Sequence, residues 1–339
     1  MQRIHRAGRN PFTVMAIILL FIVIVFLISL NTGFIKIPTV DLLKTLVGAG
    51  TEQNRLIVLD FRLPRMVIAL LIGSALAISG SILQGVSQNG LADPGVLGIN
   101  AGSGLAVVLF IYLFQGPATA IFGVFYPFIM PVAALVGGMS AAFLIYILAW
   151  NKGITSVRLL LVGIGVNAAF GAALMIIQLR MNPNDFMQAL VWLSGSIGGT
   201  SWPFVWAILP WTILLIPYAI YKARFLNALH LGDEIAIGLG TNVERERRIL
   251  LLVSVALAGS AVAVGGGIAF LGLVAPHLAK GLVGPKYQML LPTAALIGAL
   301  LLLVADAIGR TALAPSEIPV GLVVSTLSAP YFIYLLMKT

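Results

Sequence analysis

The sequence predicts an all-α, polytopic membrane protein with about ten membrane segments. Of its 339 residues, 60% are hydrophobic and only 9% are charged, a composition that water-soluble globular domains do not have. Apolar stretches recur along the whole chain at intervals that leave room only for short polar connections. We therefore expect one transmembrane domain over residues 1–339 rather than a soluble domain with an anchor.

Eight apolar segments each come close to the roughly 20 residues that a helix needs to cross the hydrocarbon core. They lie at about 14–30, 66–84, 96–114, 128–149, 157–179, 203–221, 290–308 and 318–337. The first follows a basic N-terminal stretch, but no A-x-A cleavage site follows its apolar core. We therefore expect it to remain as the first helix.

The ninth stretch, Ile249 to Ala279, has no charged residue over 31 positions. One straight helix of that length would exceed a hydrocarbon core of about 30 Å, at roughly 1.5 Å per residue. We expect a full span, a turn and a short returning helix. The turn would use Gly265, Gly266 and Gly267, which adopt angles closed to other residues, and Pro276 would lie in the first turn of the returning helix.

The distribution of basic residues favours this fold-back. With it, 13 of the 20 Lys and Arg residues lie in inner loops and 7 in outer loops; with a single crossing the division is 11 to 9. Basic residues prefer the cytoplasmic side. The sequence therefore predicts both termini in the cytoplasm of a multi-pass cell-membrane protein, and it assigns the net charge of +9 to cytoplasmic loops rather than to nucleic-acid binding.

A second broken segment is predicted at "QGVSQNGLADPGVLGINAGSG", where Asp93 reads as an N-cap and Pro94 as the first helical residue. Non-helical backbone at membrane depth is tolerated only inside protein or beside a water-filled cavity. Two such breaks indicate a translocation pathway. Its candidate residues are Asn89, Asp93, Pro94, Gly265, Gly266, Gly267, Pro276 and His277.

His277 is expected to be packed or capping rather than a metal ligand, because no other ligand type stands at a suitable spacing beside it. A weak similarity between "ALAISG", from Ala75, and "ALAGSA", from Ala256, would fit an inverted repeat.

The largest cytoplasmic connection, 222–248, contains "LGDEIAIGLG". The motif reads as a short helix with acidic residues in its first turn, which suits the helix dipole, and with a glycine where it stops. From this segment alone, a docking helix for a cytoplasmic partner and an amphipathic connector on the bilayer are equally good interpretations. The residues concerned are Gly232, Asp233, Glu234, Ile235, Gly238 and Gly240.

Three arginines are expected on the outer side, against the preference of basic residues for the cytoplasmic side. Arg62 and Arg65 lie before the second span, and Arg310 lies at the end of the ninth. They could snorkel at the interface, and Arg310 could form an i, i+4 pair with Asp306. The alternative is a basic landing site for an acidic external protein.

Several absences restrict the chemistry. The chain has no cysteine, no G-x-x-x-x-G-K-[ST] phosphate loop and no H-E-x-x-H or similar catalytic cluster. We therefore expect no metal site, no cofactor and no enzymatic activity. Carboxylates are nearly absent from mid-span, which disfavours a proton-coupled carrier.

The motifs together resemble the FecCD family of ABC importer permeases. The resemblance runs through "RLPRMVIALLIGSALAISGSILQ", "LADPGVLG", "LGDEIAIGLG", "FLGLVAPHLAK", "ADAIGR" and "SEIPVGLVVSTLSAPYFIYLL". It covers nearly the whole chain. Two departures, Gly90 where the family commonly has Pro and Lys280 where it has Arg, leave the class unchanged.

The resemblance implies a ten-helix permease that pairs with a second permease, same or paralogous, and with two cytoplasmic ATPase subunits. It also implies an extracytoplasmic solute-binding protein, which raises binding-protein docking above snorkelling for Arg62, Arg65 and Arg310. The expected cargo is a ferric siderophore or similar metal chelate, with haem or cobalamin as alternatives. An ion-coupled secondary transporter and an intramembrane enzyme remain as rivals.

Overall fold

The chain folds into helices only, over the part that the structure describes. The computed structural model describes residues 10–33, 35, 37–114, 125–150 and 156–338. In chain order the helices are α1 (Pro11–Asn31), α2 (Thr39–Leu46), α3 (Glu52–Arg55), η1 (Leu56–Arg62), α4 (Leu63–Ser87), η2 (Pro94–Leu97), α5 (Ile99–Leu113), α7 (Tyr126–Ala149), α8 (Ser156–Gln178), α9 (Pro183–Leu193), α10 (Trp202–Tyr221), α11 (Ala223–His230), α12 (Asp233–Gly238), α13 (Val243–Gly265), α14 (Leu271–Val283), α15 (Tyr287–Thr311) and α16 (Val320–Lys338).

The lengths of these helices fit a multi-pass membrane protein. Seven of the described helices are long and apolar enough to cross a membrane. Three shorter apolar helices accompany them, at Ile99–Leu113, Leu271–Val283 and Val320–Tyr334. The predicted all-α, polytopic class is therefore confirmed.

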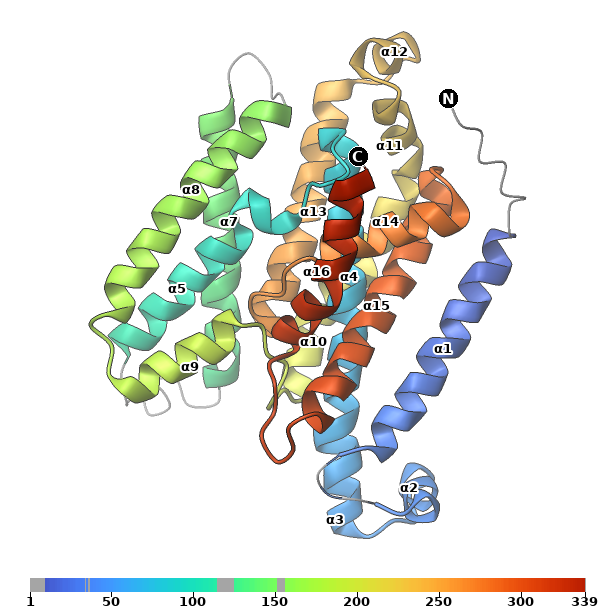
Figure 1. The fold of residues 1–339 in the computed structure, drawn as a ribbon, viewed down its shortest axis with the longest axis vertical. Helices are drawn as coiled ribbons and strands as arrows, with labels where there is room; N and C mark the ends of the chain where they lie inside the picture. Colours follow the sequence, from blue (N-terminus) through green and yellow to red (C-terminus); the bar gives the residue numbers. More distant parts are fainter. Residues whose placement is uncertain (1–9, 34, 36, 115–124, 151–155, 339) are drawn as a thin grey trace.

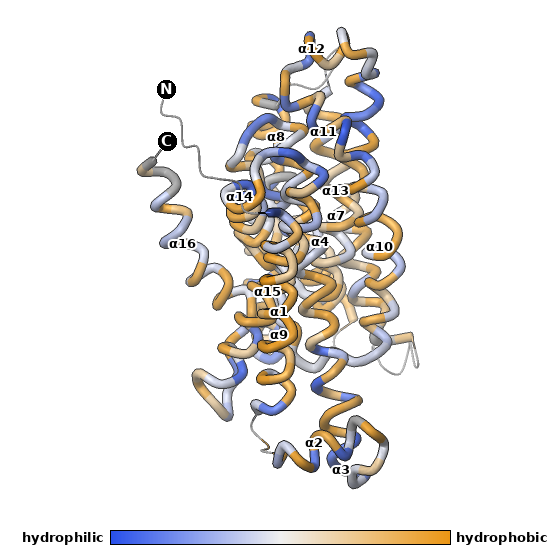
Figure 2. Tube along the Cα trace, turned by 90° about the vertical axis from the view of Figure 1, so that its right-hand side faces the viewer, coloured by the Kyte–Doolittle hydropathy of each residue, from blue (hydrophilic) through white to orange (hydrophobic). Residues whose placement is uncertain are grey.

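Short helices project at both ends of the bundle, which we call the α12 end and the α3 end (Figure 1). α11 and α12 lie at the first, and α2 and α3 at the second. α1 begins and α16 ends toward the α12 end. Hydrophobic residues dominate the length between the ends, while hydrophilic residues gather at them (Figure 2). This pattern suits a bundle whose middle lies in hydrocarbon.

α4 is the central helix of the bundle. Of the span that contains it, 78% is buried inside the structure, and it packs against α10, α13, α14 and α15. Glycines allow the closest approaches. A Cβ atom on Gly73 would lie 2.3 Å from the Gly298 carbonyl oxygen of α15, and one on Gly80 would lie 1.8 Å from the Gly272 carbonyl oxygen of α14. No side chain fits at such distances, so the sequence has glycine there.

The chain reverses direction between α13 and α14. Contacts along α4 follow the reversal: Ser254 meets Ser79, Gly265 meets Ile72, Gly272 meets Gly80 and Tyr287 meets Gly85. α13 therefore runs antiparallel to α4 toward the α3 end, and α14 brings the chain back to the α12 end. The predicted full span, turn and short returning helix are all present.

The turn itself differs in detail from the prediction. Gly265 is the last residue of α13 and Gly267 has an ordinary φ, so only Gly266, at φ 69°, uses the left-handed region. Phe270, at φ 66°, is the second left-handed residue and precedes α14. A Cβ on Gly266 would lie 2.1 Å from the Trp192 carbonyl oxygen. The glycines therefore serve close packing as well as chain reversal.

Pro276 is not in the first turn of α14, contrary to the prediction. α14 begins at Leu271, so Pro276 lies inside the helix. Proline cannot donate to the carbonyl four residues earlier, which here is Gly272. That oxygen instead accepts a hydrogen bond from Gln84 Nε2 of α4 at 3.3 Å. The proline thus leaves the Gly272 carbonyl free to accept a hydrogen bond that joins α14 to α4.

The broken segment at Asp93 is present, and Asp93 caps its start. The capped element is the short helix η2 and not the long helix α5 that follows it. Asp93 Oδ1 accepts from the Gly95 amide at 2.8 Å, and Pro94 is the first residue of η2, a single 3₁₀ turn. Gly98, at φ 73°, separates η2 from α5. The segment thus enters the bundle as a broken helix.

Candidate functional site

Arg65, at the beginning of α4, lies at the centre of an ion-pair network at the α3 end. Its Nε donates to Asp306 Oδ1 at 2.8 Å, and its Nη1 donates to Glu317 Oε2 at 2.9 Å and Oε1 at 3.1 Å. The Asp306 side chain is completely buried, whereas the Glu317 side chain is 48% exposed. Arg65 therefore joins α4 to α15 and to the loop before α16.

Arg62 and Arg310 are directed into the same end of the bundle. Arg62 is 7% exposed and its Nη1 donates to the Leu30 carbonyl at 2.6 Å. Arg310 is 9% exposed; its Nε lies 3.1 Å from Asp306 Oδ2, and its guanidinium also donates to Ser29 and to the Thr32 carbonyl. These bonds attach α1, and the residue that follows it, to η1 and α15.

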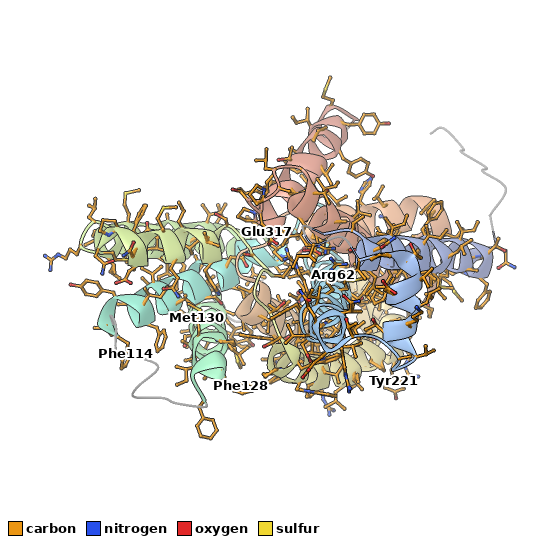
Figure 3. The ribbon with its side chains drawn as sticks, turned by 90° about the horizontal axis from the view of Figure 1, so that it is seen from below. Arg62, Phe114, Phe128, Met130, Tyr221 and Glu317 are labelled. Atoms are coloured by element: carbon orange, nitrogen blue, oxygen red, sulfur yellow. The ribbon has the colours of Figure 1, made fainter. Side chains whose placement is uncertain are left out.

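The structure brings the three predicted arginines together but gives each of them partners within the chain. The i, i+4 pair of Arg310 and Asp306, one of the two interpretations of the sequence, is present. Figure 3, viewed from the α3 end, shows Arg62 among the central helices and Glu317 beside the start of α16. Of the two arginines that flank Asp306, only Arg65 also contacts an exposed carboxylate.

A cavity of about 460 Å³ opens beside Arg65. Its wall is formed by Arg65, the end of α9 with the loop after it, and the segment that leads into α16. The α13–α14 turn packs behind the last two of these segments. The Gly321 amide donates to the Gly195 carbonyl at 2.9 Å, and a Cβ on Gly195 would lie 2.9 Å from the Gly267 oxygen. The lining residues are Arg65, Val191, Ser196, Gly198, Gly199, Glu317, Ile318, Pro319 and Val320.

The two broken segments predicted from the sequence touch each other. A Cβ on Gly272, in the first turn of α14, would lie 2.7 Å from Pro94 Cδ and 3.2 Å from Asp93 Oδ2. Gly272 faces Gly80 of α4, so the contact lies well inside the bundle. Asp93 is therefore deeper than its position near a span end suggested.

Two predicted pathway residues lie apart from this contact. Asn89 belongs to the turn after α4, where its Oδ1 accepts from the Leu91 amide at 2.9 Å. His277 packs edge-on against the Tyr331 ring of α16, with ring centroids 5.8 Å apart. Among the described residues no group of His, Asp and Glu could hold a metal ion. The ring contact with Tyr331 agrees with the packed interpretation of His277.

α12 is the short helix predicted in "LGDEIAIGLG". It covers Asp233–Gly238, and Gly232 and Gly240 flank it with φ values of 103° and 80°. Ile235 and Ile237 are 53% and 62% exposed, whereas Ala236 is fully buried. The helix thus presents bulky apolar side chains outward at the α12 end.

Two ion pairs attach this end to α13. Arg247 Nη2 donates to Asp233 Oδ1 and Oδ2 at 2.8 and 3.0 Å, which joins α13 to the first residue of α12. Lys222 Nζ lies 2.8 Å from Glu246 Oε2, and both side chains are largely buried. Glu234 takes part in neither ion pair.

Sequence reasoning missed several of the residues that hold these sites. Glu317, Gln84 and Ser79 lie within the motifs given above, and Ser254 lies within the uncharged stretch 249–279, but the sequence predicts no role for any of them. A polar residue inside an otherwise apolar run was the available signal, because buried polar groups need partners. Its partner lies on another helix, and one sequence does not reveal which.

Comparisons with known proteins agree with this architecture. The family model described as the FecCD transport family matches residues 20–338. The chain is 60% identical over 329 residues to the iron(3+)-hydroxamate import system permease protein FhuG of Bacillus subtilis (strain 168), covering 97% of this chain and 98% of the relative. It is 39% identical over 343 residues to the hemin transport system permease protein HmuU of Yersinia pestis, covering 97% and 96%.

A solved structure is also similar. It is a transporter assigned to the metal-chelate type of ABC transporters, in an inward-facing conformation. The TM-score is 0.82 at 26% identity, with 96% of this chain and 99% of that chain covered. Both the sequence and the fold match along almost the entire length, and the chain therefore belongs to the FecCD transport family.

Proposed function

We propose that this chain is the permease subunit of a binding-protein-dependent ABC importer and that it carries a ferric hydroxamate siderophore inward. The observation that carries the proposal is the 60% identity to a hydroxamate permease over nearly both whole chains. The contact of the two broken segments supports a pathway, because irregular backbone at this depth needs protein or water around it. The chain does no chemistry on its cargo.

Hemin is the second candidate cargo, since the hemin permease is similar over the same length at 39% identity. The difference in identity favours hydroxamate. No observation in the structure favours cobalamin, a freestanding ion-coupled carrier or an intramembrane enzyme.

An uptake assay tests the function. A strain without its own hydroxamate permease, supplied with this chain, its binding protein and its ATPase, should accumulate radioactive iron given as a ferric hydroxamate. Hemin iron should not enter. An ATPase without its catalytic base should abolish uptake. Uptake that survives this change would identify an ion-coupled carrier, and equal uptake of hemin would overturn the hydroxamate assignment.

We infer that the ten apolar helices all act as membrane segments, with both ends of the chain and the α12 end in the cytoplasm. The basic residues of 222–248 and the fold-back support this topology. In this cysteine-free chain, a Lys286→Cys variant should resist an impermeant thiol reagent outside intact cells. Ready labelling there, with outer-loop controls reacting, would exclude the topology.

Two ATPase subunits are the proposed cytoplasmic partners, with α12 as the coupling helix. Its exposed Ile235 and Ile237 would pack into an apolar groove on the ATPase. Because Arg247 of α13 forms an ion pair with Asp233, a displacement of α12 would also move α13. An Ile235→Glu variant should keep binding-protein docking but hydrolyse ATP without uptake. Unchanged uptake would leave α12 as a surface connector.

A second permease, the same chain or a paralogue, is the proposed neighbour of α8 and α16. Only 11% of the α8 span is buried within this chain. Its exposed face, Leu161, Gly165, Ala168, Ala172 and Ile176, has small residues at its centre, which suit close helix packing in membranes. α16 also carries exposed apolar side chains, among them Leu322, Leu327 and Ile333, so both helices offer a face to a partner.

The binding protein is proposed to dock at the α3 end through Arg65, with Arg62 and Arg310 as buried supports. An acidic side chain of the binding protein would replace Glu317 on the Arg65 guanidinium. Arg65→Glu should slow association and reduce its salt dependence. Glu317→Gln should instead tighten docking, because it removes the internal competitor. Equal affinity of both variants at low salt would contradict this role.

A further inference from the structure

A groove of about 560 Å³ lies between α7 and α13, away from the sites described above. Its walls are mainly apolar: Phe143 is 65% exposed, Leu252 is 68% exposed and Met139 is 45% exposed. The lining residues are Met139, Ser140, Ala142, Phe143, Tyr146, Arg248, Leu251, Leu252 and Val255. Surfaces of this kind on a membrane-spanning bundle face hydrocarbon.

The groove has one polar end. Because α13 begins and α7 ends toward α12, Arg248 and Tyr146 lie at the α12 end of the groove, while Met139 and Val255 lie deeper. The Tyr146 ring packs against Trp150, with centroids 5.6 Å apart. Tyrosine and tryptophan are the residues that favour the level of lipid headgroups. The groove therefore passes from hydrocarbon depth to headgroup depth.

Arg248 carries the charge at this end. Its side chain is 51% exposed, and its contacts with Glu244 both use Nε: 3.4 Å to the carbonyl and 3.9 Å to the carboxylate. Neither of these two contacts uses an Nη group. A guanidinium fork of this kind matches the oxygens of a phosphate.

The neighbouring charges leave this end positive. Glu246 is neutralised by Lys222 and Arg247 is paired with Asp233. In the first two turns of α13 this leaves one carboxylate, Glu244, beside Arg245 and Arg248, and of these two arginines it is Arg248 that lines the groove. Charge complementarity at this position favours an anionic headgroup over a zwitterionic one, and the cytoplasmic leaflet is the side on which anionic lipids attract basic residues.

We propose that the α7–α13 groove binds one anionic phospholipid of the cytoplasmic leaflet. One acyl chain lies along Phe143, Leu252 and Val255, and the phosphate accepts hydrogen bonds from Arg248 and from the Tyr146 hydroxyl. The site depends on the membrane location of the chain and not on which chelate it carries. The lipid would join α7 to α13, the helix that ends at the broken segment.

Native mass spectrometry of the full chain in detergent tests the site. With equal amounts of dioleoyl-phosphatidylglycerol and dioleoyl-phosphatidylcholine, the wild type should retain at least five-fold more phosphatidylglycerol than phosphatidylcholine. Arg248→Gln should bring this ratio close to one. Arg245→Gln is the matched control: it removes the same charge from an exposed residue outside the groove, and it should keep the preference.

Two further measurements separate the outcomes. Val255→Phe should fill the groove and reduce retention of both lipids, while added inorganic phosphate should displace neither. Unchanged elution on gel filtration would show that the variants are folded, and Arg248→Lys serves in place of Arg248→Gln if the latter aggregates, with an intermediate ratio expected. A wild-type ratio near one, or equal losses in Arg245→Gln and Arg248→Gln, would overturn the proposal.

Discussion

α4 and α8 are almost equally apolar but have opposite surroundings. The spans that contain them have mean hydropathies of 2.3 and 2.2, yet 78% of the first and 11% of the second are buried within the chain. Hydropathy reports transfer into the membrane, where lipid and protein neighbours are nearly equivalent for an apolar side chain. It therefore finds membrane helices without distinguishing those at the centre of a bundle from those at its edge.

Small residues show the same contrast. On α4, Gly73 and Gly80 touch the backbones of α15 and α14, whereas Gly165 and Gly171 of α8 have nothing within 4 Å of an added Cβ. The same residue type thus creates a helix contact in one place and an open surface in the other. Three experiments measure how far this difference extends.

The largest effect is expected at Asp306, the buried carboxylate that joins α4 to α15. Asp306→Asn removes the carboxylate that pairs with Arg310 and leaves Arg65 with Glu317. Breaking a buried pair from one side costs about 3–5 kcal/mol. Thermal unfolding of the purified chain in detergent should therefore move to a much lower temperature. Asp60→Asn, on the exposed face of η1, is the control, and an equal shift in that variant would show that the network contributes nothing special.

The second-largest effect is expected from adding one methyl group to a glycine, and it should differ between α4 and α8. Gly80→Ala forces α4 away from the Gly272 carbonyl, and overpacking of this kind costs about 1–3 kcal/mol. Gly165→Ala meets no atom and should be neutral or stabilise α8 by about 0.5–1 kcal/mol. Both can be read from the same unfolding curves. If Gly165→Ala destabilises as much as Gly80→Ala, the exposed surface of α8 is not open.

The smallest effect concerns the hydrogen bond between α4 and α13. Ser79 Oγ donates to the Ser254 carbonyl at 2.7 Å, and Ser254 Oγ donates to the Ser79 carbonyl at 3.0 Å. Interhelical bonds in membranes are worth about 0.6 kcal/mol on average. A double-mutant cycle of Ser79→Ala and Ser254→Ala should give a coupling of that order. Thr326→Ala, which removes a bond within α16 only, should show no coupling with either.

Local signals in the sequence predicted local structure well. The helix at Asp233, the cap at Asp93 and the reversal after Gly265 each depend on a few neighbouring residues, and all three are present. Signals for α9 were equally local: Asn182 caps it and Pro183 begins it. The apolar pattern does not predict α9, because at 11 residues it is much shorter than a membrane span and lies between two longer apolar segments.

Contacts between distant segments could not be predicted in the same way. Pro276 was given the role that proline most often has at a helix start, whereas its effect here depends on Gln84, far away in sequence. The pair of Arg310 with Asp306 follows from their i, i+4 spacing on one helix. The contacts of Arg65 with Asp306 and Glu317 depend instead on how α4 packs against α15 and the segment before α16, which the apolar pattern of either helix leaves open.

The brevity of α14 has a consequence for how the protein is made. Its 13 residues reach about 20 Å as a helix, well short of a hydrocarbon core of about 30 Å. A segment of this length has too few apolar residues to leave the insertion machinery alone as a finished span. We therefore expect α13 and α14 to enter the lipid as one hairpin, released only after the ribosome has added enough of α15 to enclose them.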